Sequence, residues 1–222
     1  LDMPGEARQD WWLIQELANR LDLNWTYTHP KDVYGEIIQV VDSMKGITWD
    51  RLENQDSVVY PCASEEEPGD AIIFSENFPT ESGRAKLVPT DLVPPAETPD
   101  DEYPMVLTTG RLLEHWHTGA MTRRSTVLDT IEPEAVVHIH PKYMDQMGIQ
   151  PGDMVNVHTR RGSIQVKARM DRDVTQGMLF VPFCFSEGPA NLLTNPKLDP
   201  FGKIPEFKYC AARLEKIPQA AE

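Results

Sequence analysis

Residues 153–170 read Asp-Met-Val-Asn-Val-His-Thr-Arg-Arg-Gly-Ser-Ile-Gln-Val-Lys-Ala-Arg-Met, and they carry a clear β-hairpin pattern. An aliphatic residue occupies alternate positions on either side of a polar turn at 160–162. These apolar positions are Val155, Val157, Ile164 and Val166. Alternation with a period of two is typical of strands that bury one face, and a glycine-containing turn joins antiparallel neighbours. The stretch therefore predicts two paired strands.

Similar strand signals recur along the second half of the chain. They fall at 104–109, 134–140, 153–159, 163–170, 177–183 and 208–215. A short helix is predicted over 141–147, because Pro141 suits a first helical turn and Gly148 suits a helix end. Several short strands with brief connections and little helix predict a small closed β-barrel.

The first half of the chain has a different pattern. Apolar residues at helical spacing predict helices over 8–22, over 31–43 and from Trp49. Short apolar runs predict strands at 70–75 and 84–89 around a polar loop. We therefore expect a smaller α/β segment ahead of the barrel.

A proline-rich stretch separates the two halves. Residues 89–104 hold five prolines and many carboxylates, a composition that cannot form a core. The predicted organisation is a segment at 1–88, a linker at 89–103 and a barrel domain at 104–222.

Composition excludes several classes of protein. The chain has 222 residues and a formal net charge of -14, which argues against nucleic-acid binding. Its three cysteines are far apart and form no CxxC motif, so we expect no disulfide framework, no thiolate metal site and a reducing, cytoplasmic setting. No apolar run reaches the roughly 18–20 residues that span a bilayer. The chain begins without an initiator Met, and we expect it to be a piece of a longer, soluble polypeptide.

A candidate ligand cradle lies at 108–125, directly after an apolar strand that Gly110 ends. Its basic and imidazole side chains are Arg111, His115, His117, Arg123 and Arg124. Backbone N–H groups at a glycine turn, with guanidinium and imidazole groups beside them, suit phosphates or a polar heterocycle. Two alternatives remain open at this point. The histidines could bind a metal, although no carboxylate or cysteine stands at ligand spacing, and one arginine could form a structural salt bridge.

Two later segments offer further candidates. Asn191 follows an aromatic-rich strand and could hydrogen-bond to the edge of a ring. Phe207 and Lys208 could stack on and pair with a ligand, or could belong to an ordinary closing strand. Phe183 and Phe185 flank Cys184, and this apolar setting should raise its thiol pKa and argues against a nucleophilic role.

Other motifs point to no chemistry. His138 and His140 are expected on one strand face as partly exposed packing residues. No Ser/His/Asp order, phosphate-binding glycine loop or His-Glu-x-x-His motif is present. The residues alone thus predict a polar, phosphate-bearing ligand on a β-barrel.

Three motifs, in order, resemble the C-terminal part of the catalytic subunit of formate dehydrogenases. They are Thr109-Gly-Arg with Glu114-His-Trp-His-Thr-Gly-Ala-Met-Thr-Arg-Arg, then Phe180-Val-Pro-Phe with Ala190-Asn-Leu-Leu-Thr-Asn, then Lys203-Ile-Pro-Glu-Phe-Lys-Tyr-Cys-Ala-Ala-Arg. These enzymes are molybdopterin oxidoreductases, and the soluble, cytoplasmic type, often coupled to NAD, is the most similar. The resemblance implies a double-psi β-barrel that clamps molybdopterin guanine dinucleotides (bis-MGD) on molybdenum or tungsten. It also implies that 1–88 is the remnant of an α/β domain.

The resemblance also assigns the site. The implied cofactor-binding residues are Thr109, Gly110, Arg111, Leu112 (through its backbone), His115, His117, Thr118, Met121, Thr122, Asn191, Phe207 and Lys208. The family's metal ligand and Fe–S cysteines would lie upstream, so no catalytic or metal-binding residue is expected within this chain. The whole subunit would oxidise formate to carbon dioxide and pass electrons through Fe–S clusters to electron-transfer subunits. The alternatives are another molybdopterin oxidoreductase, such as an assimilatory nitrate reductase, or a cofactor-free barrel used for protein interaction.

Overall fold

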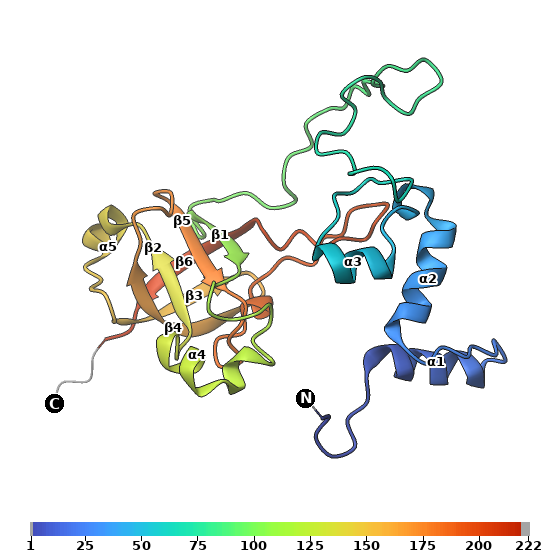
Figure 1. Ribbon diagram of the computed structural model, residues 1–222. Coiled ribbons are helices and arrows are strands. Elements are labelled where there is room, and N and C mark those ends of the chain that lie inside the picture. The colour runs from blue at the N-terminus through green and yellow to red at the C-terminus, as the bar shows by residue number, and fades with distance from the viewer. Residues whose placement is uncertain (1, 219–222) are drawn as a thin grey trace. The chain divides into compact units, whose positions relative to one another are not determined.

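The computed structural model describes residues 2–218, and the chain divides into two compact units, Leu1–Thr90 and Asp91–Glu222 (Figure 1). The first unit contains three α-helices and one 3-10 turn. They are α1 (Asp10–Arg20), α2 (Pro30–Val40), η1 (Asp42–Met44) and α3 (Trp49–Gln55). The three helices confirm the helices predicted from the sequence.

Local sequence explains where these helices begin. Pro30 occupies the first turn of α2, and the His29 side chain accepts a hydrogen bond from the N–H of Lys31. The Asp32 carboxylate accepts from the His29 N–H in return, which completes a capping box. At α3 the hydroxyl of Thr48 accepts from the Arg51 N–H. These contacts satisfy backbone donors that a helix start leaves unpaired.

The strands predicted at 70–75 and 84–89 are wrong. Both segments are turns and irregular backbone, and no strand forms among residues 2–90. Phe74 has φ of +57°, which interrupts an extended run, and the side chains of Ile72 and Leu87 are 76% and 91% exposed. The apolar runs therefore have no partner strand and no core to face in this unit. The first unit is helical, not α/β, over its described residues.

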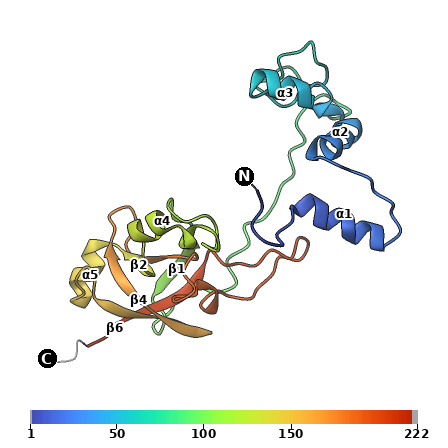
Figure 2. The same ribbon diagram turned by 60° about the horizontal axis from the view of Figure 1, so that its bottom comes forward.

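The second unit is a closed six-stranded barrel (Figure 2). Its strands are β1 (Met105–Gly110), β2 (Val136–Ile139), β3 (Met154–Thr159), β4 (Gly162–Met170), β5 (Met178–Pro182) and β6 (Cys210–Lys216). Around the barrel the order is β1-β5-β2-β4-β3-β6, and β6 pairs with β1 to close it. The β1–β5 and β2–β4 pairs are parallel and the other pairs are antiparallel. All six predicted strands are confirmed, as is the double-psi β-barrel.

The predicted hairpin at 153–170 is formed by β3 and β4. Val155 lies opposite Val166, and Val157 lies opposite Ile164, with all four side chains buried. The closed barrel abolishes free sheet edges and gives these inward residues one shared interior.

The α-helices of the barrel unit, α4 (Thr126–Ile131) and α5 (Pro141–Met147), lie outside the barrel wall (Figure 2). α5 is as predicted and ends at Gly148, which has φ of +63°. His140 lies beyond the end of β2 and accepts from the Lys142 N–H at 3.2 Å. The expectation that it shares a strand face with His138 is therefore wrong. α4 was not predicted, because six residues are too few to show helical periodicity.

The proline-rich stretch contains no helix or strand, and residues from Asp91 onward belong to the barrel unit. Within residues 2–218 no helix is both long and apolar enough to cross a membrane.

Candidate functional site

The end of β1 requires glycine and leaves a free arginine beside it. A Cβ built on Gly110 would lie 2.2 Å from Cε2 of Phe180, so no larger residue fits without displacing that ring. The next residue, Arg111, is exposed, and its guanidinium forms no hydrogen bond or ion pair within the described chain. A guanidinium without a protein partner is available for a bidentate contact with an anion.

His115 is buried and fixed within the loop after β1. Its Nε2 lies 2.7 Å from the carbonyl oxygen of Glu132, and its Nδ1 lies 3.3 Å from Oγ1 of Thr122. A carbonyl oxygen only accepts, so in the neutral ring Nε2 donates and Nδ1 accepts from the threonine hydroxyl. Thr122 also accepts from the Trp116 N–H at 2.9 Å. Both nitrogens of His115 therefore have partners within the chain, and its contact with a ligand stays a prediction.

His117, in contrast to His115, is exposed. Its φ is +51°, a left-handed conformation that is uncommon for a residue with a side chain and often marks a functional position. The loop is held close to the barrel at Gly119, where a Cβ would lie 2.6 Å from the carbonyl oxygen of Cys184. The His117 ring packs edge-on against Phe183, with centroids 5.3 Å apart. The sequence cannot distinguish the two histidines, and the fold separates their roles.

A second group of residues meets β1 from the segment before β6. The hydroxyl of the buried Thr109 donates to the carbonyl oxygen of Phe207 at 3.0 Å, and the Lys208 ammonium donates to the carbonyl oxygen of Thr109. The same ammonium lies 5.5 Å from the Phe207 ring centroid and 5.9 Å from that of Phe183. An ammonium has three N–H groups, so Lys208 keeps donors beyond the one used here.

Two cavities in the barrel unit are lined by most of these residues, and a third, about 510 Å³, is lined in part by Arg111 and Leu112. The first, about 530 Å³, is lined by Thr109, His117, Thr118, Phe183, Asn191, Thr194, Asn195, Pro196, Pro205 and Phe207. The second, about 430 Å³, is lined by Arg111, Leu112, Leu113, Glu114, His115, Trp116, His117, Thr122 and Leu128. His117 lines both. Most of the predicted residues are thus brought together, although Asn191 and Phe207 lie more than seventy positions after His117 in the sequence.

Three predicted residues, Gly110, Met121 and Lys208, line neither cavity, and several lining residues were not predicted. Met121 is 68% exposed and lines neither cavity. Lys208 adjoins the larger cavity through its contacts with Thr109, Phe183 and Phe207. Asn195, Pro196 and Pro205 were missed, and the Asn-Pro pair directly after the predicted loop was the one available turn signal.

The other two arginines of the cradle have different environments. Arg123 bonds to Asp129 at 2.5 Å and to Glu187 at 2.9 Å, and its guanidinium lies 4.7 Å from the Phe185 ring centroid. It is the structural salt bridge expected of one of the three. Arg124 is exposed, forms no side-chain hydrogen bond or ion pair with described residues, and lines neither cavity.

Cys184 is buried beneath this loop. Burial raises the pKa of its thiol to about 11, so the group is a neutral thiol at physiological pH. The expectation of a raised pKa is confirmed. A neutral thiol is a poor nucleophile, so a nucleophilic role stays disfavoured.

The chemistry of the two cavities suits a flat, polar ligand that bears phosphate. Guanidinium and ammonium groups supply charged donors, an amide and an imidazole supply donors and acceptors, and Phe183 and Phe207 supply ring faces. Within residues 2–218 no group of three or more His, Cys, Asp or Glu side chains could hold a metal ion.

Residues 105–211 match the family described as the molydopterin dinucleotide binding domain. The barrel is similar to this family, and residues 105–211 are called the dinucleotide-binding domain after it. Both cavities of the dinucleotide-binding domain lie within the matched residues. A pterin dinucleotide combines flat hydrogen-bonding rings with a diphosphate, which is the ligand chemistry that the cavities fit.

The similarity to known relatives extends beyond the dinucleotide-binding domain to nearly the whole chain. The chain is 42% identical over 219 residues to F420-dependent formate dehydrogenase 1 subunit alpha of Methanococcus maripaludis, covering 98% of this chain and 32% of that protein. It is 32% identical over 223 residues to the assimilatory nitrate reductase catalytic subunit of Bacillus subtilis, covering 96% of this chain and 31% of that protein. The chain thus spans about a third of the length of these relatives. The predicted resemblance to formate dehydrogenase catalytic subunits is confirmed.

A solved structure shows the same fold. Acetylene hydratase from Pelobacter acetylenicus superimposes with a TM-score of 0.69 at 20% identity, covering 98% of this chain and 34% of that one.

Proposed function

We propose that this chain holds and orients a molybdopterin guanine dinucleotide within a formate dehydrogenase catalytic subunit. The observation that carries the proposal is the convergence of two distant segments, 109–118 and 191–207, on one cavity inside the dinucleotide-binding domain. The identity to formate dehydrogenase alpha subunits supports formate as the substrate and carbon dioxide as the product.

The side chains of this chain would bind the cofactor in distinct ways. Arg111, whose guanidinium has no partner among the described residues, would pair with the diphosphate, while His117 and Asn191 would hydrogen-bond to ring edges. Phe207 would pack against a ring, and Lys208 would add a charged donor beside it. When bound, the cofactor supplies the two-electron redox chemistry with its molybdenum or tungsten ion.

A further set of residues would keep this binding geometry in place. His115 and Thr122 fix the loop that carries His117, and the Thr109 hydroxyl fixes the backbone of Phe207. Gly110 would allow the chain to turn toward the ligand. Such supporting contacts keep a site preorganised. Leu112 (through its backbone), Thr118 and Met121 would instead contact the cofactor along the same loop.

The metal ligand and Fe–S clusters belong, in this proposal, to the parts of the polypeptide outside this chain. Electron-transfer subunits and a cytoplasmic location are part of the same proposal. The acceptor could be NAD, which the resemblance implied, or F420, which the names of two relatives contain.

Activity of the full-length polypeptide tests the proposal against its rivals. We expect the purified protein to reduce a redox dye with formate, and to contain guanine nucleotide together with molybdenum or tungsten. Nitrate reduction by reduced dye, without formate oxidation, would instead favour the nitrate reductase alternative, to which the chain is also similar. Absence of both nucleotide and metal would favour a cofactor-free interaction module.

A further inference from the structure

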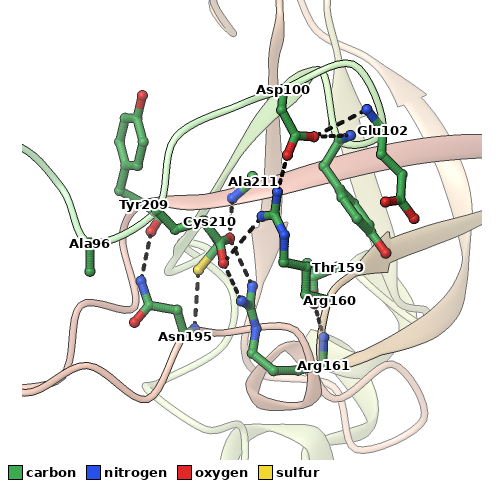
Figure 3. Close-up of polar contacts among 12 residues, drawn as sticks. Ala96, Asp100, Glu102, Thr159, Arg160, Arg161, Asn195, Tyr209, Cys210 and Ala211 are labelled. Atoms are coloured by element: carbon green, nitrogen blue, oxygen red, sulfur yellow. Dashed lines mark hydrogen bonds and ion pairs between the residues drawn. The ribbon is translucent and has the colours of Figure 1, made fainter.

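The proline-rich stretch before the barrel is fastened to it by side chains (Figure 3). Asp100 accepts the N–H groups of Glu102 and Tyr103 and forms an ion pair with Arg160 in the β3–β4 turn. The backbone N–H of Ala96 donates to both oxygens of Glu206, at 3.1 and 3.0 Å. A stretch without regular structure is thereby placed by specific contacts.

Glu97 is the centre of these contacts. Its side chain is only 13% exposed, and its carboxylate accepts from Arg161 at 2.5 and 3.1 Å. It also accepts the backbone N–H of Ala211 on β6 at 2.5 Å. Burial alone would raise the pKa of this carboxyl, but the hydrogen bonds from Arg161 and Ala211 hold the pKa below its ordinary value. Glu97 is therefore an ionised, partly buried anchor.

Arg161 connects this anchor to the wall of the larger cavity. Its Nε and one terminal nitrogen donate to the carbonyl oxygen of Leu193, at 3.1 and 2.9 Å. Leu193 lies between Asn191 and Asn195, both of which line the cavity. One guanidinium therefore joins the proline-rich stretch to a cavity loop.

A second set of contacts fixes the same loop at Asn195. The buried Asn195 donates from Nδ2 to Glu206 at 2.9 Å, and its backbone N–H donates to the sulfur of Cys210 at 3.2 Å. The Glu206 carboxylate also accepts the backbone N–H of Ala96, the neighbour of Glu97. Loop 191–197 is thus held from two points by residues of the proline-rich stretch and by the lead-in to β6.

We infer that Glu97 is a positioning residue for the dinucleotide cavity, acting through Arg161 to hold the wall formed by loop 191–197. Without the carboxylate, the guanidinium would remain partly buried and uncompensated and would turn toward solvent, releasing Leu193. The identity of the ligand in this inference rests on the proposed function, whereas the effect on the loop does not.

The experiment compares Glu97→Gln with Glu102→Gln in the full-length holoenzyme. Glutamine keeps the size of the side chain and removes the charge, and Glu102 is an exposed residue of the same stretch whose carboxylate bonds to no described residue. Amide hydrogen exchange is measured in loop 191–197 and in strands β3 and β4, and guanine nucleotide release is followed after dilution. We expect about tenfold faster exchange in the loop and about tenfold faster release for Glu97→Gln, with β3 and β4 unchanged and Glu102→Gln like wild type.

Each other outcome has a definite meaning. Unchanged loop exchange, or equal acceleration in loop and strands, would overturn the inference, because Glu97 would then have no local role. Faster loop exchange with unchanged nucleotide release would overturn the link to the cavity and leave the proposed function intact. A wild-type protein without guanine nucleotide would refute the proposed function, while loop exchange would still report on the anchor. If Glu97→Gln does not accumulate, Arg161→Gln tests the same connection from its other end.

Discussion

The barrel and the helical unit bury their apolar residues to very different degrees. In the barrel, side chains from all six strands share one core, and Leu107, Val137 and Val157 are fully buried. In the described part of the helical unit the buried hydrophobic residues are Ala18, Ile47 and Cys62, while Leu13, Ile14, Leu17 and Leu21 of the first helical region are more than half exposed. This contrast indicates that the stability of this chain comes mainly from the barrel, which also carries the cavities.

The largest expected effect contrasts one leucine from each unit. Leu107→Ala removes a side chain with no exposure and should lower the free energy of unfolding by about 3 kcal/mol, through lost burial and a cavity. The matched change Leu17→Ala, at a side chain that is 62% exposed, should cost less than about 0.5 kcal/mol. Urea denaturation followed by circular dichroism measures both. Equal losses would show that the helical unit contributes as much stability as the barrel.

A smaller effect separates two adjacent arginines within the barrel unit. Arg123→Ala breaks the contacts with Asp129 and Glu187 and should cost about 1–2 kcal/mol of unfolding free energy. Arg124→Ala removes a side chain without described partners and should cost less than about 0.5 kcal/mol. Thermal unfolding of the two variants gives the comparison. Similar losses would mean that the ion pairs of Arg123 do not hold the loop.

The smallest expected effect is a loss of barrel stability at low pH. Burial raises the pKa of the Glu97 carboxyl, whereas the hydrogen bonds from Arg161 and Ala211 lower it. The lowering is larger, so the folded pKa lies below the ordinary 4.5. The stabilisation is therefore complete above about pH 4.5 and is lost as pH falls through the lower folded pKa. Urea midpoints measured between pH 7 and pH 3 should fall less steeply for Glu97→Gln than for wild type below that value. The same slope in both proteins would contradict this assignment.

The sequence predicted the barrel well because each strand alternates over several residues around clear turns. It failed at 70–75 and 84–89, since a short apolar run does not reveal whether a partner strand exists. Within the site, residues 109–118 could be placed by their position after a strand. The different environments of His115 and His117 depend on backbone conformation, which a local sequence pattern does not reveal. The bond between Glu97 and Arg161 joins residues 64 positions apart, so no local pattern could predict it.

The most direct test of the account compares Arg111→Ala with Arg124→Ala in the full-length polypeptide. Both changes remove one guanidinium from the same loop, but only Arg111 lines a cavity of the dinucleotide-binding domain. Guanine nucleotide retained per polypeptide is measured after purification. The account predicts about a tenfold or greater loss for Arg111→Ala, as removal of a charge-assisted contact implies, and wild-type content for Arg124→Ala. Wild-type content in both variants would contradict the assignment of Arg111 and of the cavity it lines.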